Sequence, residues 1–159
     1  TPATRLPTPP AHALPRPVPL TMPYAISWEP AGVHRRYFGH VTVAERERSF
    51  DEICADARFD QLRYAITDYL SVQGYDIEPA ATEEIAARHI APLRTNPHIV
   101  MAAVVTDARI IAAIEHFIAL GFVTQDYRMF ATEEAARAWI ATRPGPGPVP
   151  VSRRRPPVR

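Results

Sequence analysis

The sequence places acidic and hydroxyl side chains where an α/β fold could use them for binding or for acid–base chemistry. Asp68 lies near the end of a β-prone segment, and Thr106 and Asp107 directly follow the continuous apolar run from Ile99 to Val105. Ligands of open α/β sheets usually bind beyond the carboxyl ends of the parallel strands. We therefore predict a candidate ligand or docking edge that gathers residues from two strand ends, namely Asp68, Tyr69, Ser71, Thr106 and Asp107.

The same residues also have a purely structural interpretation. Thr106 and Asp107 precede an apolar stripe at helical spacing, where they would cap a helix, and Asp68 would simply end a strand. Two aspartates act as an acid–base pair only when they are close together and desolvated, and the sequence shows neither condition. The binding edge and the structural interpretation therefore both stay open at this stage.

The histidines and the single cysteine do not indicate a catalytic or metal centre. None of the six histidines shows a ligand spacing such as H-x-x-x-H, and about 20 Å of strand would separate His34 from His40. His89 and Cys54 fall on apolar helix faces, which favours positions in or beside the core. Because the sequence also lacks a G-x-G-x-x-G loop, a P-loop and a G-x-S-x-G motif, we predict no catalytic residue, no cofactor and no metal ligand.

Prolines divide the 159-residue chain into three parts. Most of its 18 prolines lie near the two ends, and proline-rich segments cannot pair their backbones in helices or sheets. We predict a disordered tail over residues 1–22, one domain over residues 23–142, and a disordered Pro/Arg-rich tail over residues 143–159. Met22, just before the first predicted strand, is a candidate natural start.

Charge and cysteine content bound the partners and the compartment. All 18 basic residues are arginines, the formal net charge is only +1, and every acidic residue lies in the central part. The run Arg153 to Arg155 would suit nucleic acid or anionic lipid, but no aromatic residue lies among these arginines to stack on bases, so we expect no nucleic-acid partner. A single cysteine excludes an internal disulfide, which favours the cytoplasm. No apolar run reaches the ~20 residues that a membrane span needs.

Periodicity predicts the elements that must position the candidate edge. β-branched and aromatic residues favour strands, and apolar residues three and four positions apart favour helices. Residues 71–79 are expected to form a long connection, and Pro92 is expected to kink the second helix or end it early. The expected strands are 24–28, 33–41, 63–70, 99–105 and 127–130, and helices are expected to follow Thr42 (to about Ala57), Thr82, Asp107 and Thr132.

This order predicts an α/β fold with a single-layer mixed β-sheet of about five strands and about four helices. The first two strands form an N-terminal hairpin, and β-α units follow it. Right-handed crossovers would place the helices on the faces of the sheet.

Four segments of the chain carry a family resemblance. They are MPYAISWEPAGVHRRYFGHVT, FDEICADARFDQLRYAITDYLSV, NPHIVMAAVVTDARIIAAIE and MFATEEAARAWI. Together with the order of elements, they resemble the SpoIIAA-like branch of the STAS superfamily, which includes bacterial anti-sigma-factor antagonists. The resemblance implies a STAS-like domain without catalysis, and a fold analogy links this branch to lipid-carrying CRAL-TRIO domains.

The chain departs from the antagonists at one functional position. Those proteins carry a phosphorylatable serine in an Asp-Ser-Ser-Gly-type segment at the start of a helix. The matching segment here, ITDYLSVQGYD, keeps Asp68 but lacks the Ser-Ser-Gly run, and Ser71 is the nearest hydroxyl. The resemblance therefore does not imply regulation by phosphorylation at this place.

Three functions follow as hypotheses. The first is a non-catalytic cytoplasmic domain that works as a regulatory or protein-interaction module, with a protein partner or a homodimer. The alternative is a carrier or binder of a small apolar or lipid-like ligand, held between the helices and the sheet. The third is an enzyme that uses Asp68 and Asp107, which requires that the two carboxylates lie close together.

Overall fold

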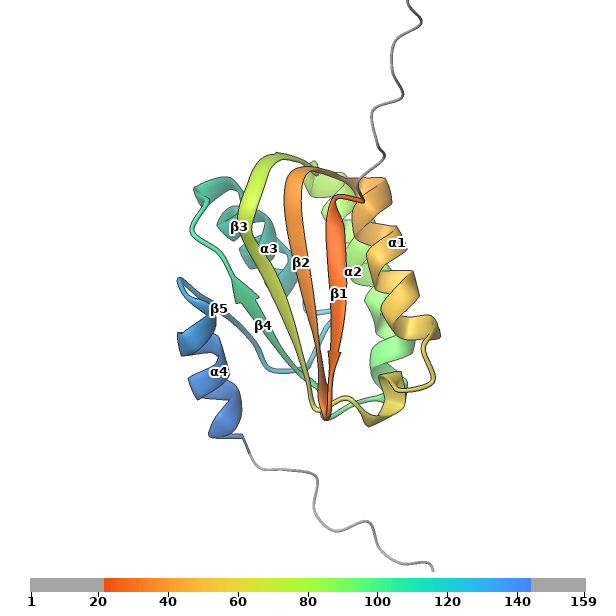
Figure 1. Cartoon of the computed structure of the whole chain (residues 1–159). Helices are drawn as coiled ribbons and strands as arrows, with labels where there is room; N and C mark the ends of the chain where they lie inside the picture. The colour runs from red at the N-terminus through yellow and green to blue at the C-terminus, as the bar shows by residue number, and fades with distance from the viewer. Residues whose placement is uncertain (1–21, 144–159) are drawn as a thin grey trace, which may run out of the picture.

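The computed structural model describes residues 22–143, which form one mixed β-sheet with helices on both faces (Figure 1). The strands lie in the order β1-β2-β3-β4-β5; β1 is antiparallel to β2, and the other neighbours are parallel. The predicted α/β class, with its opening hairpin and β-α units, is confirmed. The strands are β1 (Tyr24–Glu29), β2 (Gly32–Thr42), β3 (Tyr64–Asp76), β4 (Val100–Val104) and β5 (Tyr127–Phe130), and the helices are α1 (Val43–Ala55), the short 3₁₀ turn η1 (Phe59–Gln61), α2 (Pro79–Thr95), α3 (Ala108–Ala119) and α4 (Glu133–Ala141).

The three crossover helices lie on one face of the sheet, and α4 lies on the other (Figure 1). The side chains of β4 and of Val105, the next residue, explain why the apolar run in this part of the sequence is unbroken. Ala102 and Val104 belong to the cluster beneath α4, whereas Ala103 and Val105 belong to the cluster beneath α3. A parallel strand that is covered on both faces must be apolar at every position.

Two helix starts follow local chemistry that the sequence shows. Thr42 and Glu45 form a capping box at the start of α1, in which each side chain meets the other residue's backbone N–H. At the start of α4, the Thr132 hydroxyl accepts a hydrogen bond from the Ala135 N–H at 3.2 Å. Both caps were predicted and are confirmed.

His89 on α2 is a core residue, as predicted. Its ring stacks on Phe50 with centroids 3.7 Å apart, and its Nδ1–H donates to the Ile85 carbonyl at 2.7 Å. Burial lowers the pKa of His89 to about 3, so the imidazole is neutral. Cys54 is half-buried at the edge of the cluster beneath α1, and burial raises the pKa of its thiol to about 12.

The structure corrects the prediction for residues 71–79. Strand β3 does not end at Leu70 but continues to Asp76, because Phe38 to Thr42 of the long strand β2 pair with this polar stretch. Val72 and Tyr75 pack against the core cluster from it. A strand that is held by a distant partner needs no apolar pattern of its own.

Three helix boundaries also differ from the prediction. Helix α2 begins at Pro79 with Glu78 as its N-cap, and Thr82 lies inside the first turn, where its hydroxyl donates to the Glu78 carbonyl at 3.3 Å. Proline is well suited to the first helical position because its missing N–H would have no partner there. The helix continues past Pro92 to Thr95, and α1 ends at Ala55 rather than near Ala57.

The predicted tails lie outside the described residues, except for Met22 and Arg143 at their inner ends. Their disorder stays a prediction. Among residues 22–143, none of the helices combines the length and the apolar character that crossing a membrane requires.

Candidate functional site

The structure places the residues of the predicted edge in different surroundings. Asp68 is not at the end of a strand but inside β3, opposite Val104, the last residue of β4. Its carboxylate accepts hydrogen bonds from Arg36 Nε at 3.0 Å and from the Leu70 N–H at 2.8 Å. Tyr69, the next residue, points to the opposite face, where it is only 2% exposed and stacks on Tyr37.

The remaining members of the predicted edge lie on the surface. Ser71 and Thr106 are exposed. Asp107 is the N-cap of α3; it accepts from the Arg109 N–H at 2.8 Å and forms an ion pair with the Arg109 guanidinium. These hydrogen bonds from Arg109 lower the pKa of Asp107 to about 2. Asp68 and Asp107 are thus each held by a different arginine, which gives no support to an acid–base pair. The ligand edge itself stays a prediction.

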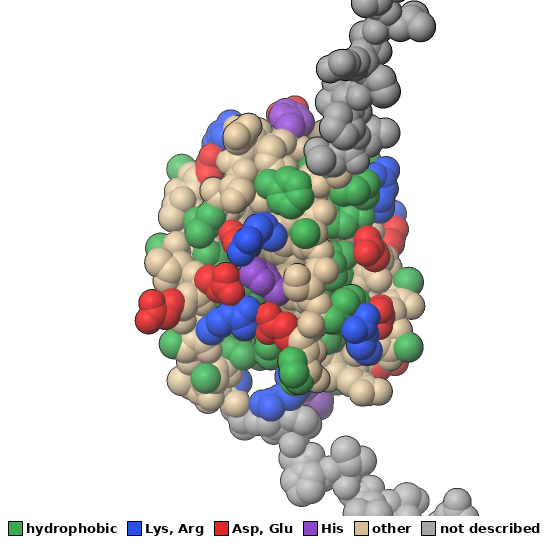
Figure 2. Space-filling view, in the orientation of Figure 1, with side chains coloured by type: hydrophobic (Ala, Val, Ile, Leu, Met, Phe, Trp, Pro, Cys, Tyr) green, Lys and Arg blue, Asp and Glu red, His purple; other side chains and the backbone are tan. Residues whose placement is uncertain are grey.

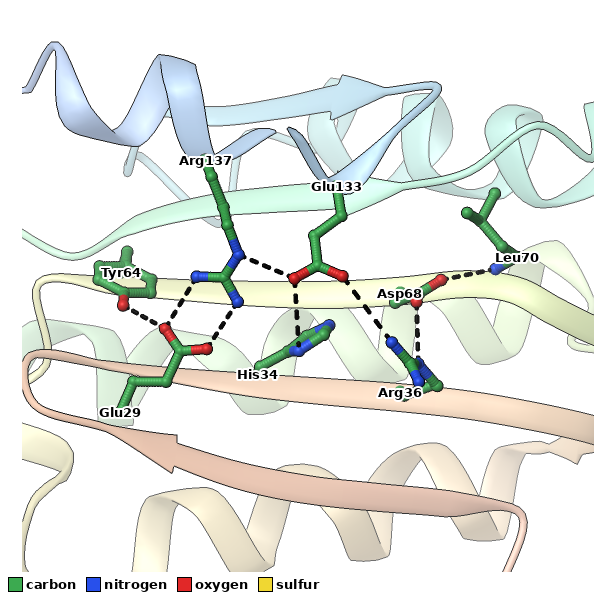
Figure 3. A network of polar contacts seen from close by, with 8 residues as sticks. All are labelled: Glu29, His34, Arg36, Tyr64, Asp68, Leu70, Glu133 and Arg137. Atoms are coloured by element: carbon green, nitrogen blue, oxygen red, sulfur yellow. Dashed lines mark hydrogen bonds and ion pairs between the residues drawn. The ribbon is translucent and has the colours of Figure 1, made fainter. Parts of the chain in front are cut away.

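A network of charged side chains surrounds Asp68 on the face of the sheet that carries α4 (Figure 3). Arg137 of α4 donates to Glu29 at the end of β1, with Nη2 2.7 Å from Oε1 and Nη1 3.0 Å from Oε2. Arg137 Nε also donates to Glu133 one helical turn earlier, at 2.8 Å. The Tyr64 hydroxyl of β3 completes the shell around Glu29. Helix α4 is therefore tied to the hairpin by directional, charge-assisted bonds.

His34 and Arg36 of β2 join this network to Asp68. His34 Nδ1 lies 4.0 Å from Glu133 Oε1, and Arg36 Nη2 lies 3.8 Å from Glu133 Oε2. Arg36 therefore contacts the carboxylates of both Asp68 and Glu133. His34 is 11% exposed in its side chain, and its Nε2 is buried without a hydrogen-bond partner.

The electrostatics of the network are those of paired charges. Hydrogen bonds from Arg137 lower the pKa of Glu29 to about 2, against the opposing effect of partial burial. The same bonds, together with those to Glu133, raise the pKa of Arg137 further above its ordinary value. Glu29 and Arg137 are both ionised at neutral pH, so this pair holds structure and does not exchange protons.

One group of side chains in the network has the composition of a metal-ligand set. Ligand atoms of His34, Asp68 and Glu133 lie within 4.8 Å of one another. Imidazole and carboxylate are ordinary ligands of zinc and related ions. The Arg36 guanidinium, however, already forms ion pairs with both carboxylates, and Arg137 pairs with Glu133 as well. A cation would have to displace Arg36, so the residues as arranged fit an ion-pair network better than a metal centre.

Sequence reasoning found Asp68 but missed its surroundings. Glu29 and Arg137 are 108 positions apart, and Arg36 and Asp68 are 32 apart, so no local pattern joins them. The visible signal was the spacing of Glu133 and Arg137, which are four residues apart on one helix face.

The fold, a hairpin followed by β-α units with the last helix on the opposite face of the sheet, is similar to that of two solved structures. The solved structure of SpoIIAA in its unphosphorylated form is similar with a TM-score of 0.51 at 12% identity, over 75% of this chain and 98% of that chain. An uncharacterized DUF3478 protein from Shewanella loihica PV-4, which has a SpoIIAA-like fold, gives 0.50 at 15% identity, over 74% and 93%.

The family is defined by the sequence itself. The model of the SpoIIAA-like family matches residues 33–141, so the chain belongs to the SpoIIAA-like family. The predicted resemblance to this branch of the STAS superfamily is confirmed. No curated protein matches the chain. At these identities the two solved structures establish the fold, and the function has to be argued from this chain's own surface.

Proposed function

We propose that this chain is a non-catalytic, cytoplasmic regulatory domain that docks a protein partner on the part of its sheet that α4 leaves open. The observation that carries the proposal is that α4 covers only part of its face of the sheet. Helix α4 lies along β3, β4 and β5, whereas Ala25 and Ser27 of β1 and Arg36 of β2, which share its face, are exposed. A sheet face that is left open in this way is available to a second molecule.

The chemistry of the open face favours a protein as its occupant. Leu70 is 47% exposed beside Asp68 and Arg36, and Phe38 of β2 is half-buried next to them. Figure 2 shows this side of the molecule, where acidic, basic and apolar side chains alternate over short distances. Protein interfaces combine an apolar centre with complementary charges at the rim. A lipid surface would instead favour a patch of one sign.

The same face gives little support to catalysis. Asp68 and Glu29 are engaged by arginines, and the best His–carboxylate cluster, around His34, is occupied by Arg36. A general acid or base needs a group that can change its protonation state near neutral pH. Membership of the SpoIIAA-like family supports a regulatory or interaction domain in general.

Two exposed apolar residues allow a matched test. The full chain would be used to capture proteins from a lysate of its native organism as wild type, as Leu70→Asp and as Ile118→Asp. Ile118, 39% exposed, lies on α3 on the other side of the sheet. We expect one protein to be retained by the wild type and by Ile118→Asp, and to be depleted at least about tenfold with Leu70→Asp, as expected for a central apolar contact.

The outcomes separate the alternatives. Retention of the same protein by Leu70→Asp would show that the partner does not dock on the open face. A homodimer that dissociates in Leu70→Asp but not in Ile118→Asp, measured by light scattering, would make a second copy of this chain the partner. A wild type that is monomeric and retains no protein would remove the docking function itself.

A further inference from the structure

Two arginines are buried between the sheet and the helices without an acidic partner. Arg35 of β2 is 7% exposed and Arg46 of α1 is 8% exposed. Arg35 donates to the Ser49 hydroxyl at 3.2 Å and to the Thr67 hydroxyl at 3.0 Å, and Arg46 donates to the Tyr37 hydroxyl at 3.4 Å. Within residues 22–143, the hydrogen-bond partners of both guanidinium groups are thus neutral hydroxyls. The Nε atoms of both are buried with no partner.

Such an arrangement leaves positive charge uncompensated. Removing an ion from water costs several kcal/mol unless an opposite charge or a full set of hydrogen bonds replaces the water. The chain provides aromatic faces as partial compensation. Arg35 and Arg46 lie 5.1 and 5.6 Å from the centroid of the Tyr37 ring, and Arg46 lies 5.9 Å from that of Tyr69. Cation–π contacts offset only part of a buried charge.

The positive charge of the two arginines also acts on Tyr37. Burial alone would raise the pKa of Tyr37, but the charges of Arg35 and Arg46, together with hydrogen bonds from Ser49 and Arg46, outweigh burial and lower this pKa below its ordinary value. At Tyr69, Tyr75 and Tyr127 burial outweighs the arginine charge, and the pKa is raised. The hydroxyl of Tyr69 is buried and has no hydrogen-bond partner. Hydrogen-bond donors and positive charge therefore converge on one interior region, and residues 22–143 provide no negatively charged acceptor there.

A cavity adjoins these groups. It has a volume of about 50 Å³. Its lining includes Arg35, Arg46 and Thr67, the polar side chains of His89 and Tyr127, and apolar side chains such as Phe50, Leu93 and Met101. At roughly 10–15 Å³ for each water-sized position, the space corresponds to about three to five such positions. A long acyl chain does not fit this volume, whereas a carboxylate with a short alkyl tail does.

We infer that this cavity is a binding site for a short-chain monocarboxylate of about the size of acetate or propionate. The carboxylate would accept hydrogen bonds from Arg35 and Arg46, which provide the geometry and charge that carboxylates prefer. The alkyl tail would contact the apolar wall. This site lies on the face of the sheet that carries α1, α2 and α3. It does not depend on the docking face proposed above, which is the face that carries α4.

The test is thermal unfolding of the full chain in propionate, chloride or phosphate at equal ionic strength. Arg46→Met removes one charge while keeping most of the volume, and Arg48→Met changes an exposed arginine of the same helix as the matched control. At ten times its dissociation constant, propionate should raise the Tm of the wild type and of Arg48→Met by about 5 °C. Arg46→Met should show no such rise.

Four results would overturn the inference. The first three are equal Tm values of the wild type in propionate and chloride, a wild-type response that persists in Arg46→Met, and a tyrosinate absorption band at neutral pH without ligand, since a Tyr37 phenolate would already supply negative charge to the arginines. The fourth is a response to phosphate that is as large as that to propionate and equally lost in Arg46→Met, which would make the site one for inorganic anions.

A second measurement applies if Arg46→Met does not fold. The NMR lines of ¹³C-labelled propionate should broaden in the presence of the wild type and recover their width with Leu93→Trp, which fills the cavity from α2. Sharp lines with the wild type, or equal broadening with Leu93→Trp, would contradict binding in this cavity.

Discussion

Arg137 near the end of the domain holds Glu29 in the opening hairpin through two parallel hydrogen bonds, of 2.7 and 3.0 Å. The contact joins α4 to β1 across the sheet face that the two elements share (Figure 3). Both side chains are partly exposed, at 41% for Arg137 and 21% for Glu29. The pair thus decides how firmly the last helix is attached to the first strand.

Arg137→Ala should destabilise the domain by about 1 kcal/mol, because a bidentate, partly buried pair contributes more than an ordinary surface ion pair. Denaturant unfolding measures this loss. Arg109→Ala is the control, since Arg109 forms an exposed ion pair with Asp107, the N-cap of its own helix, and its loss should cost less than the loss of Arg137. Equal losses in the two variants would show that the long-range pair adds nothing.

The Glu29 carboxylate should make the free energy of unfolding depend on pH in the acidic range. Its pKa is about 2 in the folded chain against an ordinary value of 4.5, so the unfolded chain binds the proton more tightly. The contribution of Glu29 is therefore fully present above about pH 4.5 and is lost as the pH falls toward 2. The difference in unfolding free energy between wild type and Glu29→Gln should shrink across this range. A constant difference would contradict the assignment.

The elements that the sequence predicted well are those with a local cause. The apolar run before Thr106 and the apolar stripe of α3 each show their burial directly, and the capping box at Thr42 lies within four residues. The second half of β3 was missed because Ser71 to Asp76 is mostly polar and only half of its residues are even partly buried. Only its pairing with β2 makes it a strand, and pairing between distant segments leaves no local periodicity.

The candidate site could be predicted less well for the same reason. Asp68 was identified, but its partner Arg36 lies on a neighbouring strand, and the strand order was not predictable from the sequence. Along β2, side chains alternate, so that Arg35 and Tyr37 share one face and His34 and Arg36 share the other. The sequence could not show that the face with Arg35 is the one that α1, α2 and α3 cover, because arginine is rarely buried without a carboxylate.

Gly32 should be sensitive to a single added methyl group. It pairs with Tyr64 on β3, and a Cβ at position 32 would overlap the Tyr64 ring, whose hydroxyl donates to Glu29. We expect Gly32→Ala to cost about 1–3 kcal/mol, as crowding in packed regions does. Gly74→Ala is the matched control, because the overlapping side chain there is His40, which is 57% exposed and can move into solvent. A smaller loss for Gly32→Ala than for Gly74→Ala, measured by thermal unfolding, would contradict this account.

His89 should create a second, separate dependence on pH. Burial lowers its pKa to about 3, whereas the ordinary value is 6.5, so between these values the unfolded chain binds a proton that the folded chain excludes. Stability should therefore fall as the pH is lowered from about 6.5, by up to about 1.4 kcal/mol per pH unit from this group alone. His89→Gln should remove this slope, while Gln73→Ala, at an exposed position on β3, should leave it unchanged.

The imidazole resonances of His89 provide a direct check, because they should stay at their neutral positions down to about pH 5. A midpoint near 6.5 in those resonances would show that His89 is open to water and that the packing of α2 against α1 is looser than the structure has it.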